Sequence, residues 1–228
     1  MRTRDPAAGG RAPAAESRFA AYVAHELRTP IAHQRLLAEA ALADPCPDTR
    51  AICEEVIAAC DHQLRLIDAL FDLTRSRPLL LRREPVDLAA ITRRVLRSHE
   101  RGDLDRVVTL DPAAAYGDRA LLERLCDNLV SNAIRHNVPG GRIEVSAATE
   151  AGGALLCVAN SGRAVSSDEL ARLFEPFARG PRCSGSTDGL GLGLAIVDAI
   201  ARAHGAVVTA RPRAGGGLAI EVRFPASR

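Results

Sequence analysis

Residues 43–49 read ADPCPDT and separate two long stretches whose apolar residues recur with helical spacing. The two prolines lack the backbone donor that a helix interior needs, so the first stretch, residues 16–44, ends here. Asp48 stands where a helix cap is expected, and the second stretch continues to about Arg75. Two amphipathic helices joined by a short loop predict an antiparallel hairpin. The apolar surface left over predicts that two hairpins pair into a four-helix bundle.

Beyond a short connection at residues 78–85, short strands alternate with helices. Expected helices cover residues 86–101, 118–136, 168–174 and 192–203, and expected strands cover residues 106–110, 142–148, 154–159, 207–210 and 218–224. Gly152-Gly153 predicts a hairpin turn. The predicted fold class is therefore α+β, with the two-helix hairpin followed by an α/β sandwich whose helices cover one face of a sheet.

Composition excludes several classes of protein. The 228 residues suffice for one large domain or two small ones, and 47% apolar with 25% charged residues is typical of a folded chain. All 30 basic residues are arginines, which excludes a lysine-bearing phosphate loop, and a net charge of +2 does not indicate nucleic acid. No run of about 18 apolar residues predicts a membrane-spanning helix. The six cysteines form no C-x-x-C pair and are expected to be reduced.

His25 is the first candidate functional residue. On a helical wheel it falls nearly opposite an apolar arc of about 120°, so it is expected to face solvent. The arc contains Val23, Leu27, Pro30, Ile31, Leu37, Ala38 and Ala41. Glu26 can accept a hydrogen bond from one ring nitrogen, which leaves the other free to attack. An exposed histidine is most often only a surface residue, and the zinc motif H-E-x-x-H is excluded because its fifth position is Thr29.

The segment 25–30, HELRTP, resembles the H box of sensor histidine kinases, in which that histidine accepts a phosphoryl group on a dimerising hairpin. The resemblance implies that His25 is the phosphoacceptor and that Glu26 assists removal of its proton. It also implies that Thr29 helps to position water when a phosphorylated partner is dephosphorylated.

Three later segments resemble ATP-binding boxes of the same family, in the family's order. Residues 125–137, LCDNLVSNAIRHN, resemble the N box, residues 174–177, FEPF, the F box, and residues 189–194, GLGLGL, the second glycine box. Amides one helical turn apart suit Mg²⁺ and phosphate, and glycines let backbone N–H groups approach phosphates at a helix start. The resemblance assigns Mg²⁺ to Asn132, a phosphate contact to Arg135 or His136, and nucleotide contacts also to Asn128, Asn132, Phe177, Arg179, Gly189, Gly191, Leu192, Gly193 and Leu194.

One box departs from the family pattern. The family usually has Asp-x-Gly-x-Gly, whose aspartate accepts a hydrogen bond from the adenine amino group, whereas residues 160–164 read NSGRA. An asparagine can still accept through its oxygen and can also donate, so Asn160 and Gly162 are kept as adenine-site residues. Ala164 in place of the second glycine restricts the backbone.

The expected activity is that of an ATP-dependent protein histidine kinase. In this activity Nε2 of His25 would attack the γ-phosphorus of ATP, Mg²⁺ held at Asn132 would neutralise charge on the phosphates, and residues 179–188 would close over the nucleotide. The phosphoryl group then passes to an aspartate on the receiver domain of a response regulator, and dephosphorylation of that regulator is a second expected activity. The expected partners are this regulator and a second copy of the chain, which forms a homodimer through the hairpin. Neither nucleic acid nor a membrane segment is expected.

Two alternatives remain open. Asn160 and Ala164 suggest a nucleotide-poor dimeric scaffold or phosphatase of a response regulator, which would show no affinity for Mg-ATP. A different ATPase on the same sandwich, related to chaperones or topoisomerases, is disfavoured by the H-box hairpin. Undiminished ATP hydrolysis after His25→Ala would revive it.

The predicted boundaries place a flexible linker at residues 1–15, the dimerisation and phosphoacceptor hairpin at 16–77, a second linker at 78–85 and a GHKL-type ATP-binding domain at 86–228. With no signal peptide or membrane helix predicted, the expected location is the cytoplasm, either free or tethered to the inner face of the membrane in a longer parent protein.

Overall fold

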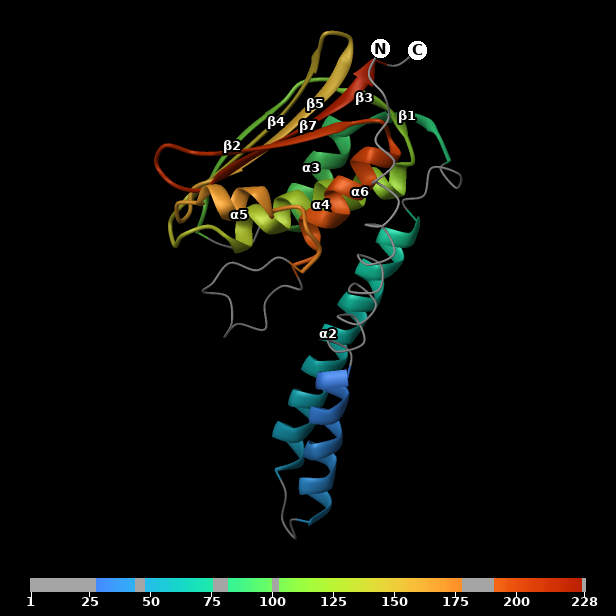
Figure 1. Cartoon of the computed structure of the whole chain (residues 1–228), viewed down its shortest axis with the longest axis vertical. Coiled ribbons are helices and arrows are strands. Elements are labelled where there is room, and N and C mark those ends of the chain that lie inside the picture. Colours follow the sequence, from blue (N-terminus) through green and yellow to red (C-terminus); the bar gives the residue numbers. More distant parts are fainter. Residues whose placement is uncertain (1–27, 44–47, 76–81, 100–102, 178–190, 227–228) are drawn as a thin grey trace, which may run out of the picture. The chain divides into compact units, whose positions relative to one another are not determined.

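The computed structural model describes residues 28–43, 48–75, 82–99, 103–177 and 191–226. The chain forms two compact units, residues 1–68 and residues 69–228 (Figure 1). Across the described ranges, no helix combines the length and the apolar content needed to cross a membrane.

Most of the predicted hairpin lies in the first unit, and its second helix continues beyond residue 68. Residues 28–43 are helical, and helix α2 spans Thr49–Arg75, so both helices are confirmed where they are described. The part of the first helix predicted over residues 16–27 lies outside the described residues. The Asp48 side chain accepts a hydrogen bond from the Ala51 amide at 3.0 Å, which caps α2.

One stripe of residues on each helix packs against the other helix, and the two stripes form the seam of the hairpin. Its half-buried residues recur three and four apart, and they are Pro30, Gln34, Leu37 and Ala41 on the first helix and Ile52, Val56, Ala59 and Gln63 on α2. Within this seam, Gln63 Nε2 donates to Gln34 Oε1 at 3.4 Å, and Gln34 Nε2 lies 3.2 Å from Cys60 Sγ. The two helices are therefore joined by polar contacts as well as by apolar packing.

A second stripe is exposed in a single chain. On α2 it consists of Cys53, Ile57, Cys60, Leu64 and Ile67, spaced alternately by four and three residues. We call these five residues the α2 stripe. On the first helix, Ile31 and Ala38 are also exposed, with Ile31 at 55%. Their predicted burial is therefore wrong for one chain, because both lie about 90° around the helix from the seam.

The second unit is an α+β sandwich built on a five-stranded sheet of order β2-β4-β5-β7-β6. Its strands are β2 (Asp105–Leu110), β4 (Arg142–Glu150), β5 (Gly153–Asn160), β6 (Val207–Pro212) and β7 (Leu218–Ala226). Strands β2 and β4 are parallel, and the other neighbours are antiparallel. One face of the sheet is covered by helices α3 (Leu88–Ser98), α4 (Arg119–Arg135) and α6 (Gly193–Ala203) (Figure 1).

The core lies between the sheet and these helices. Alternation along β4 buries Ile143, Val145 and Ala147 and leaves their neighbours more exposed. The helices supply large side chains that are at most 2% exposed, among them Leu122, Leu125, Leu129, Ile196 and Ile200. This core fixes α4 and α6, the two helices that carry most of the predicted site.

The start of the second unit differs from the prediction. Val86, expected to begin a helix, lies in strand β1 (Glu84–Asp87), which pairs with an unpredicted strand, β3 (Ala114–Gly117). Strand β1 begins within the predicted linker. Helix α3 starts only after Asp87, because the Asp87 side chain accepts a hydrogen bond from the Ala89 amide at 2.9 Å and caps the helix.

Two further elements are displaced. The turn between β4 and β5 consists of Ala151 and Gly152, both at positive φ, rather than of Gly152 and Gly153. Positive φ at both central residues is the geometry that suits a two-residue hairpin. The short helix predicted over residues 168–174 is α5 (Ser167–Ala171), which ends earlier than expected.

Candidate functional site

Four of the predicted site residues, His25, Glu26, Arg179 and Gly189, lie outside the described part of the chain. Thr29 lies exposed on the helical segment 28–43. The other predicted residues all belong to the second unit, where they gather at three places around α4, α6 and the end of β5.

The first place joins α4 to the start of α6. Asn128 is half-buried on α4, and its Nδ2 donates to the Arg124 carbonyl at 2.8 Å. A Cβ at Gly193 would lie 3.2 Å from Asn128 Oδ1, so the missing side chain lets the two helices approach here. Asn132 lies one turn further along α4 and is also half-buried.

The second place is the N-terminus of α6. Its N-cap, Leu192, gives no side-chain hydrogen bond to the first N–H groups. Gly191 has a φ of 64°, and its carbonyl accepts a hydrogen bond from the Phe177 amide at 2.8 Å. The side chains of Leu192 and Leu194 are buried, so these residues can offer an anion only their backbone. N–H groups without a side-chain cap and the positive end of the helix dipole favour an anion here.

The third place surrounds Asn160, which is 5% exposed at the end of β5. Its Nδ2 donates to the carbonyls of His136, at 3.2 Å, and Ser161, at 2.6 Å. A Cβ at Gly162 would lie 2.6 Å from the His136 carbonyl, so only glycine fits between them. The end of α4 and the loop after β5 are therefore in direct contact.

Sequence reasoning missed two glycines that close this third place from the opposite side. Gly216 and Gly217, in the turn between β6 and β7, have φ values of 87° and 91°. Cβ atoms there would lie 2.4 Å from the Gly162 carbonyl and 2.0 Å from the Asn160 carbonyl. The run of three glycines at residues 215–217 was the available signal, but it does not say which loop the turn meets.

Two arginines act on His136, whose carbonyl contacts Asn160. Partial burial lowers the pKa of His136, and Arg135 and Arg163 lower it further. The guanidinium of Arg163 makes paired contacts with Glu169 at 3.0 and 2.5 Å, which lowers the pKa of Glu169 to about 2. Glu169 also completes a capping box with Ser166 at the start of α5. Because its pKa is lowered from the ordinary value of 6.5, His136 is neutral at pH 7.

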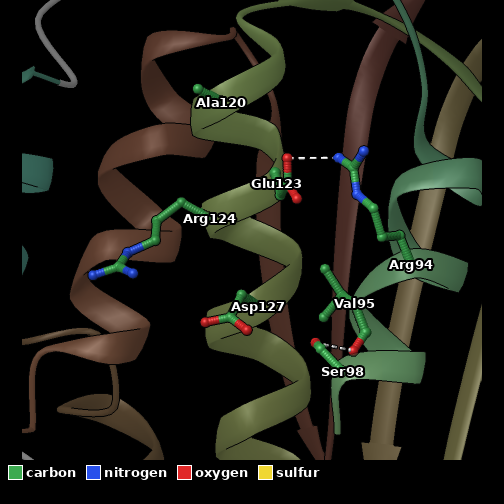
Figure 2. Close-up of a pocket in the computed structure, with 7 residues that line it drawn as sticks. All are labelled: Arg94, Val95, Ser98, Ala120, Glu123, Arg124 and Asp127. Carbon is green, nitrogen blue, oxygen red and sulfur yellow. Dashed lines mark hydrogen bonds and ion pairs between the residues drawn. The ribbon is translucent and has the colours of Figure 1, made fainter.

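A separate groove lies between α3 and α4 (Figure 2). Its volume is about 340 Å³, and its lining consists of Arg94, Val95, Ser98, Ala120, Glu123, Arg124 and Asp127. An ion pair between Arg94 and Glu123, at 2.6 Å, joins its two walls. None of the predicted site residues lines this groove, so it is distinct from the candidate site.

Two family models match the chain. Residues 15–78 match the His Kinase A (phospho-acceptor) domain. Residues 117–228 match the histidine kinase-, DNA gyrase B- and HSP90-like ATPase. The first match includes the H box, and the second includes all three places described above.

Sensor proteins of bacteria are similar over nearly the whole chain. Sensor protein CutS of Streptomyces coelicolor is 40% identical over 94% of this chain and 54% of its own length. Sensor protein CzcS of Cupriavidus metallidurans is 33% identical over 92% of this chain and 46% of its own length. The chain thus spans about half the length of the curated relatives it matches.

Solved structures agree in fold. The histidine kinase AdeS of Acinetobacter baumannii has a TM-score of 0.73 at 22% identity, over 90% of this chain and 98% of that one. The mycobacterial sensor histidine kinase MprB has a TM-score of 0.56 at 32% identity, over 63% of this chain and 97% of that one. With both family models matched in order, the chain belongs to the sensor histidine kinases.

Proposed function

We propose that this chain is the catalytic core of a sensor kinase, which uses ATP to phosphorylate His25 and passes the phosphoryl group to an aspartate on a response regulator. The observation that carries the proposal is the start of α6, where glycines and N–H groups without a side-chain cap lie beside Asn128 of α4. The similar protein ShkA, 27% identical with a TM-score of 0.64, was solved in complex with AMPPNP.

The three places suit three parts of Mg-ATP. The backbone of Gly191 and Gly193 receives the phosphates, because a helix N-terminus favours anions. Asn160 and Gly162 receive the adenine. Arg135 is exposed one turn beyond the proposed metal ligand and supplies charge to a phosphate.

Asn132 is the proposed ligand of Mg²⁺, with Asn128 one turn away on the same face of α4. Amide oxygens are hard, neutral donors, and they suit a metal that keeps several waters and binds substrate phosphates. Mg²⁺ would supply charge neutralisation at those phosphates. In the described ranges, no three His, Cys, Asp or Glu side chains gather into a metal site.

The proposed chemistry is an in-line displacement. Nε2 of His25 forms a bond to the γ-phosphorus as the bond from that phosphorus to the bridging oxygen breaks, and ADP leaves. Glu26 accepts a hydrogen bond from the other ring nitrogen and so stabilises the charge that the ring gains. Most of the rate enhancement then comes from positioning and charge neutralisation. Thr29, exposed on its helix, is proposed to orient water when the regulator is dephosphorylated.

The α2 stripe supports a homodimer. Ile57 and Leu64 are each 59% exposed, although an apolar side chain of this size is usually buried. Alternate spacing by four and three residues is the pattern by which helices pack in bundles. We propose that a second copy covers the stripe and completes a four-helix bundle.

The test is incubation of the chain with ATP labelled at the γ-phosphate. Wild type should acquire an acid-labile, base-stable phosphoryl group, and His25→Gln should acquire none. Absence of Mg-ATP binding by a folded wild-type chain would favour the scaffold or phosphatase. Steady hydrolysis that persists undiminished in His25→Ala would instead favour an ATPase without phosphohistidine.

A further inference from the structure

Asn160 stands where the family usually has an aspartate, and its surroundings suit an amide. Its Nδ2 lies 3.2 Å from the carbonyl oxygen of His136 and 2.6 Å from that of Ser161. A carbonyl oxygen can only accept, so the atom that faces both must be a donor. These two partners fix the orientation of the amide and turn its Oδ1 away from them.

The carbonyl of His136 makes this requirement stricter. His136 is the C-cap of α4, so its carbonyl lies at the negative end of the helix dipole. A carboxylate at position 160 would place negative charge against this helix end and against the Ser161 carbonyl, in a residue that is only 5% exposed. Burial raises the free energy of a charge far more than that of a hydrogen-bonded amide. The cation of the same loop, Arg163, already pairs with Glu169.

The backbone leaves residue 160 no room to move. It pairs with Ile143 of β4 on one side and with Leu218 of β7 on the other. A Cβ at Gly217 would lie 2.0 Å from the Asn160 carbonyl, so the glycine turn presses directly on this residue. The backbone therefore cannot move a carboxylate at position 160 away from the two carbonyls, and only rotation about the side-chain bonds could separate them.

We propose that this nucleotide site requires a neutral amide at position 160, and that aspartate there weakens ATP binding rather than restoring it. Asn160 Oδ1 receives no hydrogen bond within the described part of the chain. It is the acceptor that selects an amino group at position 6 of the purine. The identity of this ligand rests on the proposed function, whereas the requirement for an amide concerns the folded chain alone.

The experiment compares the whole wild-type chain with Asn160→Asp and Asn160→Ala. Thermal unfolding without nucleotide tests the amide requirement, and Asn160→Asp should unfold at the lowest temperature because it adds repulsion to the lost hydrogen bonds. Calorimetric titration with Mg-ATP tests the ligand, and Kd should rise about tenfold or more in Asn160→Asp. Wild type should bind purine riboside triphosphate, which lacks the amino group, about tenfold more weakly than ATP, and Asn160→Ala should lose this preference.

The outcomes are distinct. Failure of Asn160→Asp to fold, while Asn160→Ala folds, supports the amide requirement. An Asn160→Asp chain as stable as wild type, or one that binds Mg-ATP as tightly, overturns the proposal. If wild type binds no Mg-ATP, the proposed function fails, and the order of the unfolding temperatures still decides whether the fold requires the amide.

Discussion

The imidazole of His204 joins the end of helix α6 to the start of helix α4. Its Nε2 accepts a hydrogen bond from the backbone N–H of Asp118, the N-cap of α4, at 3.0 Å, and its Nδ1 donates to the Ile200 carbonyl at 2.7 Å. Because Nε2 accepts, the ring is neutral, in agreement with the lowering of its pKa by burial. This contact fixes the helices that carry Asn128 and Gly193 against each other.

We expect the free energy of unfolding to fall as the pH drops below about 6.5. The unfolded chain binds a proton at His204 near the ordinary pKa of 6.5, whereas the folded chain resists it, so the stability present above that pH is lost in acid. Urea unfolding at a series of pH values measures the slope. His204→Gln should flatten it in part, since His136 has a lowered pKa as well. His33→Gln, exposed on the hairpin, is the control. An unchanged slope in His204→Gln would refute this explanation.

A charge in the α2 stripe should dissociate the dimer. Leu64→Asp places a carboxylate where we expect a second copy to pack, and burying an unpaired charge is strongly unfavourable. Sedimentation should then show a single chain of 24.2 kDa, whereas wild type should sediment as a dimer. Ala58→Asp adds the same charge on the opposite, exposed face of α2 and should stay dimeric. A dimer that survives Leu64→Asp would remove the α2 stripe from the interface.

Gly217→Ala should weaken both the fold and nucleotide binding. The new Cβ would lie 2.0 Å from the Asn160 carbonyl at a φ of 91°, and strain of this kind costs about 1–3 kcal/mol. We expect a lower unfolding midpoint and a Kd for Mg-ATP raised about tenfold or more. Gly215→Ala is the matched control, because a Cβ there meets nothing within 4 Å. Equal effects of the two variants would show that the turn does not position Asn160.

Asn132→Ala should slow phosphorylation strongly while leaving the fold intact. Asn132 is half-buried on α4 and is the proposed Mg²⁺ ligand, so its loss should lower the initial rate of labelling about 100-fold or more. Chelation of Mg²⁺ should do the same in wild type. Ser131→Ala, the neighbouring change on α4, should retain most of the rate. Labelling that is independent of both Mg²⁺ and Asn132 would contradict the assignment of the metal.

Elements with a clear hydrophobic period were predictable, and short ones were not. The hairpin helices and β4 show their periods over many residues, which is why they were recognised. Strand β1 is only four residues long, contains Pro85 and buries only Val86. Neither the spacing of a helix nor the alternation of a strand can be recognised in so short a segment. It exists because it pairs with β3, and such pairing depends on distant parts of the chain.

The candidate site, too, could be predicted from the sequence only in part. Asn128 and the glycines before α6 were recognised from local motifs, and the structure places Asn128 beside Gly193. The contact between Asn160 and Gly217 could not be predicted, because it follows from the register of β5 against β7. No motif in the sequence singles out His204. Its hydrogen-bond partner, the backbone N–H at the start of α4, comes within reach only when α4 and α6 pack together.

The most direct test asks which histidine carries the phosphoryl group. Cleavage after arginine separates residues 19–28, FAAYVAHELR, which contain His25, from residues 29–35, TPIAHQR, which contain His33. After brief exposure of the intact chain to labelled Mg-ATP, we predict an acid-labile label on the first peptide and none on the second. Label on the second peptide, or on neither while ATP is hydrolysed, would contradict the central claim that His25 is the phosphoacceptor.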